Sequence, residues 1–238
     1  MALRDSLRPL FGAALGLGLA GALLLPRLSA LAEEAPRRLP ESAIQAIEAP
    51  GSQVAVFAGG CFWGVQGVFQ HVRGVTSAVS GYAGGTRADA DYRTVSGGGT
   101  GHAEAVAVTY DPAVIRYDEL LRIFFSVALD PTQVDRQGPD SGRQYRSAVF
   151  PQDAGQARIA KAYIAQLDAA KSYARPVATR IEPGAAFYPA EGYHQDFMAL
   201  HPGHPYIAAN DAPKLEALKH LFPERTAAQP VLVNRPPA

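Results

Sequence analysis

The 238-residue chain contains one cysteine, one tryptophan and two methionines. A single cysteine cannot form an internal disulfide, so no disulfide framework holds this fold together. Lysine and arginine number 22, as do aspartate and glutamate, which gives a formal net charge of +0. With no basic stripe either, the composition argues against a nucleic-acid-binding protein. The fold must therefore depend on a hydrophobic core, and the lone thiol is available for chemistry.

The N-terminus has the features of an export signal. Arg4 and Arg8 precede an unbroken apolar stretch over residues 11–25, which is short for a membrane span of roughly 20 residues. Ala30 and Ala32 are small residues of the kind that a signal peptidase requires, and we expect cleavage after Ala32. No cysteine lies at that site, which excludes a lipid-modified lipoprotein. We therefore predict a periplasmic protein without a membrane segment, the alternative being a membrane tether through an uncleaved signal anchor.

After the predicted signal peptide (residues 1–32), the length suits one domain with an extension at each end. Residues 33–51 are rich in alanine, proline, glutamate and arginine and are expected to form a loose lead-in. Residues 52–205 carry the apolar patterns of helices and strands and form the predicted main domain. Residues 206–238 form a predicted C-terminal extension, with a short helix over residues 214–221.

Helical and strand-like apolar spacings follow one another along the main domain. In chain order they predict a strand over 54–58, a helix over 62–70, strands over 75–82 and 102–110, a helix over 117–128, a strand over 144–150, a helix capped by Asp153 and ending near 170, and a strand over 176–182. The glycine-rich segment between the second and third strands is predicted to contain no helix, and residues 130–142 are predicted to be loop. This order predicts an α+β fold, a two-layer sandwich of helices on a mixed β-sheet.

Cys61 lies in the segment Gly59-Gly60-Cys61-Phe62-Trp63-Gly64, directly after an apolar strand. If a helix begins there, its first N–H groups and the positive end of its dipole lower the pKa of the thiol. The alternative is a buried, inert cysteine that packs as a small hydrophobic residue. In an exported protein with one cysteine, that cysteine can be either a free reactive thiol or part of an intermolecular disulfide. The flanking glycines and aromatic residues favour the reactive thiol.

Glu104 is the strongest candidate for an acid that assists Cys61. It opens an apolar strand, and if Val106 and Val108 face the core, Glu104 points the same way. Burial would raise the pKa of this carboxyl group, so that it stays protonated and acts as a general acid. The alternative is a carboxylate at a solvent-facing strand end.

Three further polar residues lie in predicted loops, where functional groups are common. Tyr92 lies in Asp91-Tyr92-Arg93, and Asp140 and Tyr145 lie in a polar segment with two glycines that precedes a strand. Each alone is more often an ordinary residue than a catalytic one. A phenol is nevertheless a good hydrogen-bond donor to a substrate oxygen.

Several short motifs gain specificity from occurring in a fixed order. They resemble the motifs of the class A peptide methionine sulfoxide reductases (MsrA) over roughly residues 52–205. The motifs are Gly60-Cys61-Phe62-Trp63-Gly64, Gly81-Tyr82-Ala83-Gly84-Gly85, Thr100-Gly101-His102-Ala103-Glu104, Asp130-Pro131-Thr132-Gln133, residues 140–147 and Tyr193-His194-Gln195. The resemblance implies an α+β fold with a ferredoxin-like core. It also implies reduction of the S-epimer of methionine sulfoxide, free or in oxidised proteins, which would be repaired.

The resemblance further implies thiol chemistry with no metal and no prosthetic cofactor. Cys61 would be the nucleophile, and Glu104 the acid that protonates the sulfoxide oxygen. A sulfoxide sulfur is a poor electrophile until its oxygen is protonated or strongly hydrogen-bonded, so thiolate attack needs such an acid. Collapse of the adduct would release methionine and leave Cys61 as a sulfenic acid.

The same resemblance assigns the substrate contacts. Tyr92 and Tyr145 would hydrogen-bond the sulfoxide oxygen, and Asp140 would support the site. Phe62 and Trp63 would form the apolar pocket for the S-methyl group. An inverted sulfur would misplace both the methyl group and the oxygen, which explains selectivity for one epimer.

The chain departs from many members of this family in two ways. It has no cysteine after Cys61, whereas many relatives carry recycling cysteines near the C-terminus. The sulfenic acid would therefore be reduced by another molecule, a small thiol or a thioredoxin-like protein outside the cytoplasm. Phe197 stands where relatives often have tyrosine, and we expect it to be a packing position.

Other classes of function fit the residues less well. A cysteine hydrolase would need a histidine base such as His194, but no segment resembles a peptidase signature. A zinc site could use His194, His201 and His204, but the prolines among them disfavour a regular ligand-bearing helix. A non-enzymatic redox switch at the thiol would leave Glu104 and the tyrosines without a purpose.

Overall fold

The computed structural model describes residues 33–233. The predicted signal peptide, residues 1–32, lies outside the described residues, as do residues 234–238, so the cleavage site stays a prediction. Within residues 33–233, no helix is long and apolar enough to cross a membrane.

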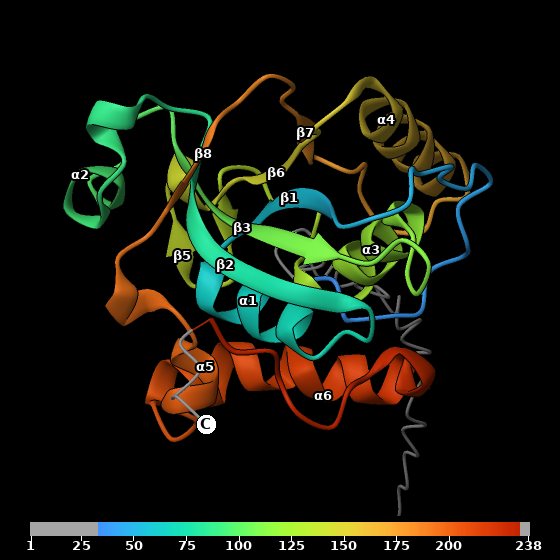
Figure 1. The fold of residues 1–238 in the computed structure, drawn as a ribbon. Coiled ribbons are helices and arrows are strands. Elements are labelled where there is room, and N and C mark those ends of the chain that lie inside the picture. Colours follow the sequence, from blue (N-terminus) through green and yellow to red (C-terminus); the bar gives the residue numbers. More distant parts are fainter. Residues whose placement is uncertain (1–32, 234–238) are drawn as a thin grey trace, which may run out of the picture. The chain divides into compact units, whose positions relative to one another are not determined.

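A six-stranded sheet forms the centre of the described chain (Figure 1). Its order is β7-β6-β1-β3-β2-β8, with β1 at Gln53–Gly59, β2 at Val75–Ala83, β3 at Ala103–Tyr110, β6 at Ser147–Phe150, β7 at Arg180–Ile181 and β8 at Phe187–Pro189. Strands β6 and β7 are parallel, and the other neighbouring strands are antiparallel. The sheet is therefore mixed, as the sequence predicts.

The main helices follow their predicted positions closely. They are α1 at Phe62–Gln70, α3 at Tyr117–Ile123 with a π-helical continuation η3 at Phe124–Ala128, α4 at Ala154–Ala169 and α6 at Ala212–Leu221. Asp153 caps α4, since its carboxylate accepts a hydrogen bond from the Gln156 N–H at 2.8 Å. Shorter helices are η5 at Gly192–His194, α5 at Phe197–Leu200, η6 at Ile207–Asp211 and η7 at Pro223–Arg225.

The two faces of the sheet are packed in different ways. Buried residues of the helices, such as Phe69 and Leu121, join Val106 and Val108 in one large hydrophobic cluster. The opposite face holds a smaller cluster built mostly from alanines, with Phe150 as its large member. Helices on one face of a mixed sheet confirm the predicted α+β sandwich.

The glycine-rich segment after β2 contains helical turns, contrary to the prediction. A 3₁₀ turn η2 spans Arg87–Asp89, and α2 spans Tyr92–Ser96. Asp91 starts α2 because its carboxylate accepts a hydrogen bond from the Thr94 N–H at 3.0 Å. The Tyr92 N–H also donates to the distant Glu191 at 2.9 Å, so a local cap and a tertiary contact together hold this helix among the glycines.

The strands of the second half are shorter than predicted. A small hairpin of β4 (Arg136–Gln137) and β5 (Asp140–Ser141) occupies part of the predicted loop. The strand predicted over 144–150 begins only at Ser147, because η4 at Arg143–Tyr145 forms a turn before it. The strand predicted over 176–182 is reduced to β7.

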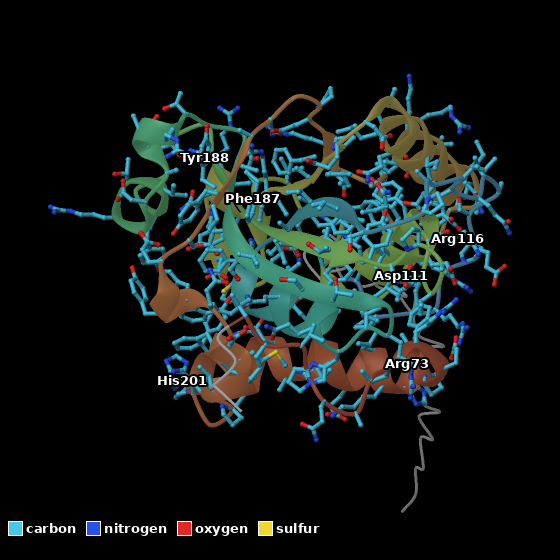
Figure 2. All side chains as sticks on the ribbon, in the orientation of Figure 1. Arg73, Asp111, Arg116, Phe187, Tyr188 and His201 are labelled. Carbon is cyan, nitrogen blue, oxygen red and sulfur yellow. The ribbon has the colours of Figure 1, made fainter. Side chains whose placement is uncertain are left out.

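Strand β8 was not predicted at all. It carries Phe187 and Tyr188 along the edge of the sheet beside β2 (Figure 2). Pairing with β2 holds this short edge strand, and so short a segment has no periodic apolar pattern of its own to reveal it.

Both ends of the described chain pack against the core. Leu39 is only 2% exposed and Ala46 is buried, although residues 33–51 contain no helix or strand. Residues beyond 205 form η6 and α6, which lie along α1 (Figure 1). The predicted C-terminal extension therefore adjoins the helix that begins beside Cys61.

Candidate active site

Cys61 is the N-cap residue of α1, at the turn that leads from β1 into the helix. Gly60 makes this turn possible with a φ of +86°, a conformation that residues with a Cβ rarely adopt. Gly64 is required one turn later, because a Cβ there would overlap the carboxylate of Asp211. The glycines of the motif therefore place the sulfur at the start of a tightly packed helix.

The pKa of the Cys61 thiol is raised, which is opposite to the sequence-based expectation. Burial disfavours the thiolate, and the carboxyl groups of Glu104 and Asp211 act in the same direction. A backbone hydrogen bond at Trp63 and the charge of Lys214 lower the pKa, but they are smaller effects. A helix terminus contributes at most about 2 kcal/mol, which does not offset the removal of a thiolate from water.

Glu104 is 2% exposed, and it lies on the same side of β3 as Val106 and Val108. The predicted inward orientation is therefore confirmed. One carboxyl oxygen accepts a hydrogen bond from the Phe62 N–H at 3.0 Å, so the acid is held at the residue next to Cys61. Burial raises the pKa of Glu104 to about 8. At neutral pH this side chain is mostly a neutral acid that can donate a proton.

The three predicted polar residues, Tyr92, Asp140 and Tyr145, lie near Glu104. Burial raises the pKa of Tyr145, and the charges of Glu104 and then Asp140 act on its phenol in the same direction. Burial also raises the pKa of Tyr92, whose phenol experiences the charges of Glu104 and Cys61. Both phenols are therefore protonated hydrogen-bond donors at neutral pH. The three side chains converge on the space beside Cys61 and Glu104.

Phe62 and Trp63 form an aromatic wall together with His194. The Phe62 ring lies 4.9 Å from the His194 ring, and the Trp63 Nε1–H donates to His194 Nδ1 at 3.2 Å. Phe197 stacks on Trp63 with ring centroids 3.8 Å apart and an angle of 11°. Phe197 is therefore a packing position, as predicted. Trp63 is held from two sides, which keeps its ring in one orientation.

Three residues beyond position 205 were missed by the sequence reasoning. Tyr206 donates a hydrogen bond to Asp140, and Asp211 is fully buried with the Lys214 ammonium 3.2 Å from its Oδ1. Burial raises the pKa of Asp211. No spacing pattern links these residues to Cys61, because the packing of η6 and α6 on α1 brings them there.

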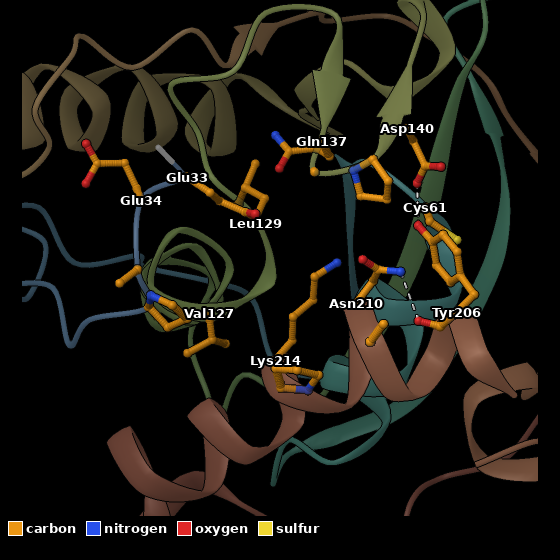
Figure 3. Close-up of a pocket in the computed structure, with 16 residues that line it drawn as sticks. Glu33, Glu34, Cys61, Val127, Leu129, Gln137, Asp140, Tyr206, Asn210 and Lys214 are labelled. Atoms are coloured by element: carbon orange, nitrogen blue, oxygen red, sulfur yellow. Dashed lines mark hydrogen bonds between the residues drawn. The ribbon is translucent and has the colours of Figure 1, made fainter. Parts of the chain in front are cut away.

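A cavity of about 300 Å³ opens beside Cys61 (Figure 3). Asp140 and Tyr206 lie near Cys61, and the Lys214 side chain extends from α6 toward the middle of the cavity. Glu33 and Glu34 line the other end. The thiol therefore adjoins a space that holds charges of both signs.

The histidines considered above as a catalytic base or as metal ligands are not arranged for either role. Across residues 33–233, no group of three or more histidine, cysteine, aspartate or glutamate side chains is placed to hold a metal ion. His194 contacts aromatic rings, and burial lowers its pKa. In the same described range, no histidine forms a hydrogen bond with Cys61. The geometry therefore does not support a cysteine–histidine hydrolase.

Comparison with known proteins identifies the family. The family model of peptide methionine sulfoxide reductase (PMSR) matches residues 53–226. Peptide methionine sulfoxide reductase MsrA 2 of Mesorhizobium japonicum is 60% identical over 185 residues, which cover 78% of this chain and 95% of that protein. The protein of the same name from Synechocystis is 52% identical over 181 residues, 76% of this chain and 85% of that protein.

A solved structure agrees with these sequence matches. Mxr1 from Saccharomyces cerevisiae in its reduced form superposes with a TM-score of 0.58 at 33% identity, over 64% of this chain and 87% of that chain. The residues matched by the family model include Cys61, Glu104 and the η6–α6 segment. The chain therefore belongs to the peptide methionine sulfoxide reductase family, in its MsrA class, and is an oxidoreductase of methionine sulfoxide.

Proposed function

We propose that this chain reduces methionine-S-sulfoxide, free and in proteins, to methionine through a sulfenic acid on Cys61, and so repairs oxidised proteins. One observation carries the proposal. Glu104 is buried, has a pKa of about 8, and is hydrogen-bonded to the residue that follows Cys61. A neutral carboxylic acid beside a thiol supplies the proton that sulfoxide reduction requires.

The reaction follows from the positions of these groups. The sulfoxide oxygen lies among the Glu104 carboxyl and the phenols of Tyr92 and Tyr145, which donate hydrogen bonds to it. The Cys61 thiolate attacks the sulfur as Glu104 protonates the oxygen. The sulfur–oxygen bond of the substrate then breaks, and the oxygen ends on Cys61. Methionine leaves as the reduced thioether, and Cys61 is oxidised to a sulfenic acid.

Asp140 supports the site through Tyr206, whose phenol donates to its carboxylate. Phe62 and Trp63 hold the S-methyl group on the apolar side. Since the oxygen meets hydrogen-bond donors and the methyl group meets aromatic carbon, the R-epimer would place at least one group against the wrong surface.

An external thiol completes the cycle. Cys61 is the only cysteine in the sequence, so an internal disulfide cannot form. The sulfenic acid is reduced first to a mixed disulfide and then, by a second thiol, back to free Cys61. A small thiol and a thioredoxin-like protein are both chemically suitable, and the reaction uses no prosthetic cofactor.

Export to the periplasm is part of the proposal. The support is the N-terminal sequence, with Arg4, Arg8 and the apolar residues 11–25 before Ala32. N-terminal sequencing of the protein from a bacterial periplasmic fraction should find Glu33 as the first residue. Recovery of the full-length protein from the membrane fraction would instead indicate that the N-terminal segment is an uncleaved signal anchor.

A single-turnover experiment tests the chemistry. Purified protein mixed with methionine-S-sulfoxide in the absence of reductant should release about one methionine per enzyme. Mass spectrometry should show one added oxygen on Cys61, trapped with dimedone. Cys61→Ser should release no methionine. A protein that forms neither product would contradict the proposal.

A further inference from the structure

The cavity beside Cys61 extends beyond the sulfoxide-binding group. Its lining shares Asp140 and Tyr206 with that site and includes Cys61, but not Glu104, Tyr92 or Tyr145. Phe62 and Trp63, the proposed methyl pocket, are also absent from its lining. Most of this cavity therefore lies on a side of Cys61 away from the proposed sulfoxide-oxygen donors and methyl pocket.

Lys214 supplies the positive charge of this space. Its ammonium is 3.2 Å from Asp211, and it would lie 3.0 Å from a Cβ on Gly64, in the first turn of α1. Figure 3 shows the side chain reaching from α6 into the middle of the cavity. A lysine ammonium has three donors, and one bond to Asp211 leaves capacity for an anionic ligand.

Glu33 and Glu34 line the far end of the cavity. The Glu34 carboxylate pairs with Arg37 and accepts a hydrogen bond from the Ala174 N–H at 2.7 Å, so the negative charge offered to a ligand is that of Glu33. One ligand that fits these charges carries a carboxylate near Lys214 and an ammonium group near Glu33. A volume of about 300 Å³ suits a small molecule. A thioredoxin-like protein would have to insert its cysteine into this space, since Cys61 is only 8% exposed.

We propose that this cavity admits the reducing thiol, a small molecule that carries both a carboxylate and an amino group, and that Lys214 binds its carboxylate. Glutathione and free cysteine share this chemistry. The inference rests on the proposed function, because the sulfenic acid that this thiol reduces is the product of sulfoxide reduction at Cys61.

The direction of attack agrees with this assignment. The oxygen of the sulfenic acid comes from the substrate, so it starts on the side of Glu104 and the two tyrosines. Displacement at sulfur is in line, and the incoming thiolate therefore approaches from another side, where the cavity lies. A sulfur–sulfur bond forms, the sulfur–oxygen bond breaks, and the oxygen leaves as water after protonation by Glu104. A second molecule of the small thiol then attacks the mixed disulfide, which releases the Cys61 thiol and the disulfide of the two small thiols.

The test measures reduction of the Cys61 sulfenic acid by pairs of thiols. Enzyme is first oxidised by one equivalent of methionine-S-sulfoxide, and the methionine released is counted. It is then mixed with glutathione or glutathione diethyl ester, in which both carboxylates are blocked, and in a second series with cysteine or cysteine ethyl ester. Thiolate concentrations are matched within each pair. Rapid quench and intact-mass analysis give the second-order rate constant for the mixed disulfide. The measured quantity is the ratio of free-acid to ester rate constants.

For the unmodified chain we expect this ratio to be about ten or more for at least one pair, as a charged hydrogen bond predicts. Lys214→Gln should bring the ratio close to one. Lys219→Gln is the matched control, because Lys219 lies on the same helix and pairs with Glu216 at 2.8 Å but is exposed. It should leave the ratio unchanged. The pair with the larger ratio identifies whether glutathione or cysteine fits better.

Three outcomes would overturn the inference. They are a ratio near one in the unmodified chain, a ratio that survives Lys214→Gln, and reduction by a thioredoxin but by neither small thiol. A change in the reactivity of Cys61 affects the free-acid and ester rate constants equally and cancels in their ratio. An effect of Lys214 on Cys61 alone would therefore leave the ratio unchanged, unlike loss of carboxylate binding. If no methionine is released in the first step, the proposed function fails instead, and the two failures are distinguishable.

Discussion

Glu104 accepts a hydrogen bond from the backbone N–H of Phe62 at 3.0 Å. This contact joins the start of β3 to the first residue of α1, and it places a buried acid at the turn that carries Cys61. The donor stabilises the carboxylate, yet burial is the larger effect and the pKa still rises to about 8. The hydrogen bond therefore fixes the position of the Glu104 carboxyl, and this carboxyl keeps its proton at neutral pH.

Removal of the acid should slow the chemical step. Glu104→Gln keeps the size and the hydrogen-bond acceptor but cannot deliver a proton, so we expect a rate of sulfenic acid formation about 100- to 10,000-fold lower. Substrate binding should change little. Rapid-quench measurement of methionine release would show this, with Glu216→Gln on the exposed face of α6 as the control. An unchanged rate in Glu104→Gln would exclude Glu104 as the acid.

The same step should depend on pH in a defined way. Glu104 loses its proton as the pH rises through about 8, so the rate of the acid-assisted step should fall above that pH, by up to about tenfold per unit. At lower pH the rate should fall because Cys61, whose pKa is raised, is less often a thiolate. Glu104→Gln should lack the descending limb in a single-turnover pH profile. A descending limb that persists in this variant would belong to another group.

Glu104 should also make folding stability depend on pH. Its pKa is about 8 in the folded chain, against an ordinary value of 4.5. Between these values the folded state binds a proton that the unfolded state lacks, so the free energy of unfolding falls as the pH rises, by at most about 1.4 kcal/mol per unit. Glu104→Gln should therefore raise Tm more at pH 8 than at pH 5. An equal shift at both pH values would contradict the raised pKa.

Gly64 should not tolerate a side chain. Its missing Cβ leaves room for the Asp211 carboxylate, which is buried. Gly64→Ala forces this contact apart and should lower the free energy of unfolding by about 1–3 kcal/mol in urea titrations. Gly99→Ala, with no atom within 4 Å of the new Cβ, should change it by less than about 0.5 kcal/mol. Similar values for the two variants would show that η6 yields without loss of stability.

Arg146 joins the segments that carry Tyr145 and Glu104. It is 2% exposed, pairs with Glu182 at 2.8 Å, and donates to the carbonyls of Gly101 and Arg143. Arg146→Met leaves these acceptors without a partner and should lower the free energy of unfolding by about 2–4 kcal/mol.

The exposed pair of Arg180 and Asp135 is the matched comparison, with a distance of 3.0 Å and both side chains about 40% exposed. Arg180→Ala should cost less than about 1 kcal/mol. Chemical denaturation of both variants checks the difference, and an Arg146 effect as small as that of Arg180 would show that the buried pair is replaceable.

Much of the fold could be read from local pattern. Helices α1, α3 and α4 bury apolar residues at helical spacing, and Asp153 is an N-cap that a sequence displays directly. The same reasoning failed for α2, where Asp91 starts a helix among glycines, and for β8. Edge strands and short capped turns are held by partners elsewhere in the chain, so their own residues carry little signal.

The sequence by itself determined the candidates for the nucleophile and the acid, and it predicted the inward orientation of Glu104. A lone cysteine at a strand–helix turn and the parity of β3 are local properties, and each follows from a few neighbouring residues. Only the tertiary structure decided the direction of the Cys61 pKa shift and the presence of Tyr206, Asp211 and Lys214. Electrostatic energy depends on what surrounds a group in space. The surroundings of Cys61 come from Glu104, 43 residues along the chain, and from Asp211 and Lys214, about 150 residues along it.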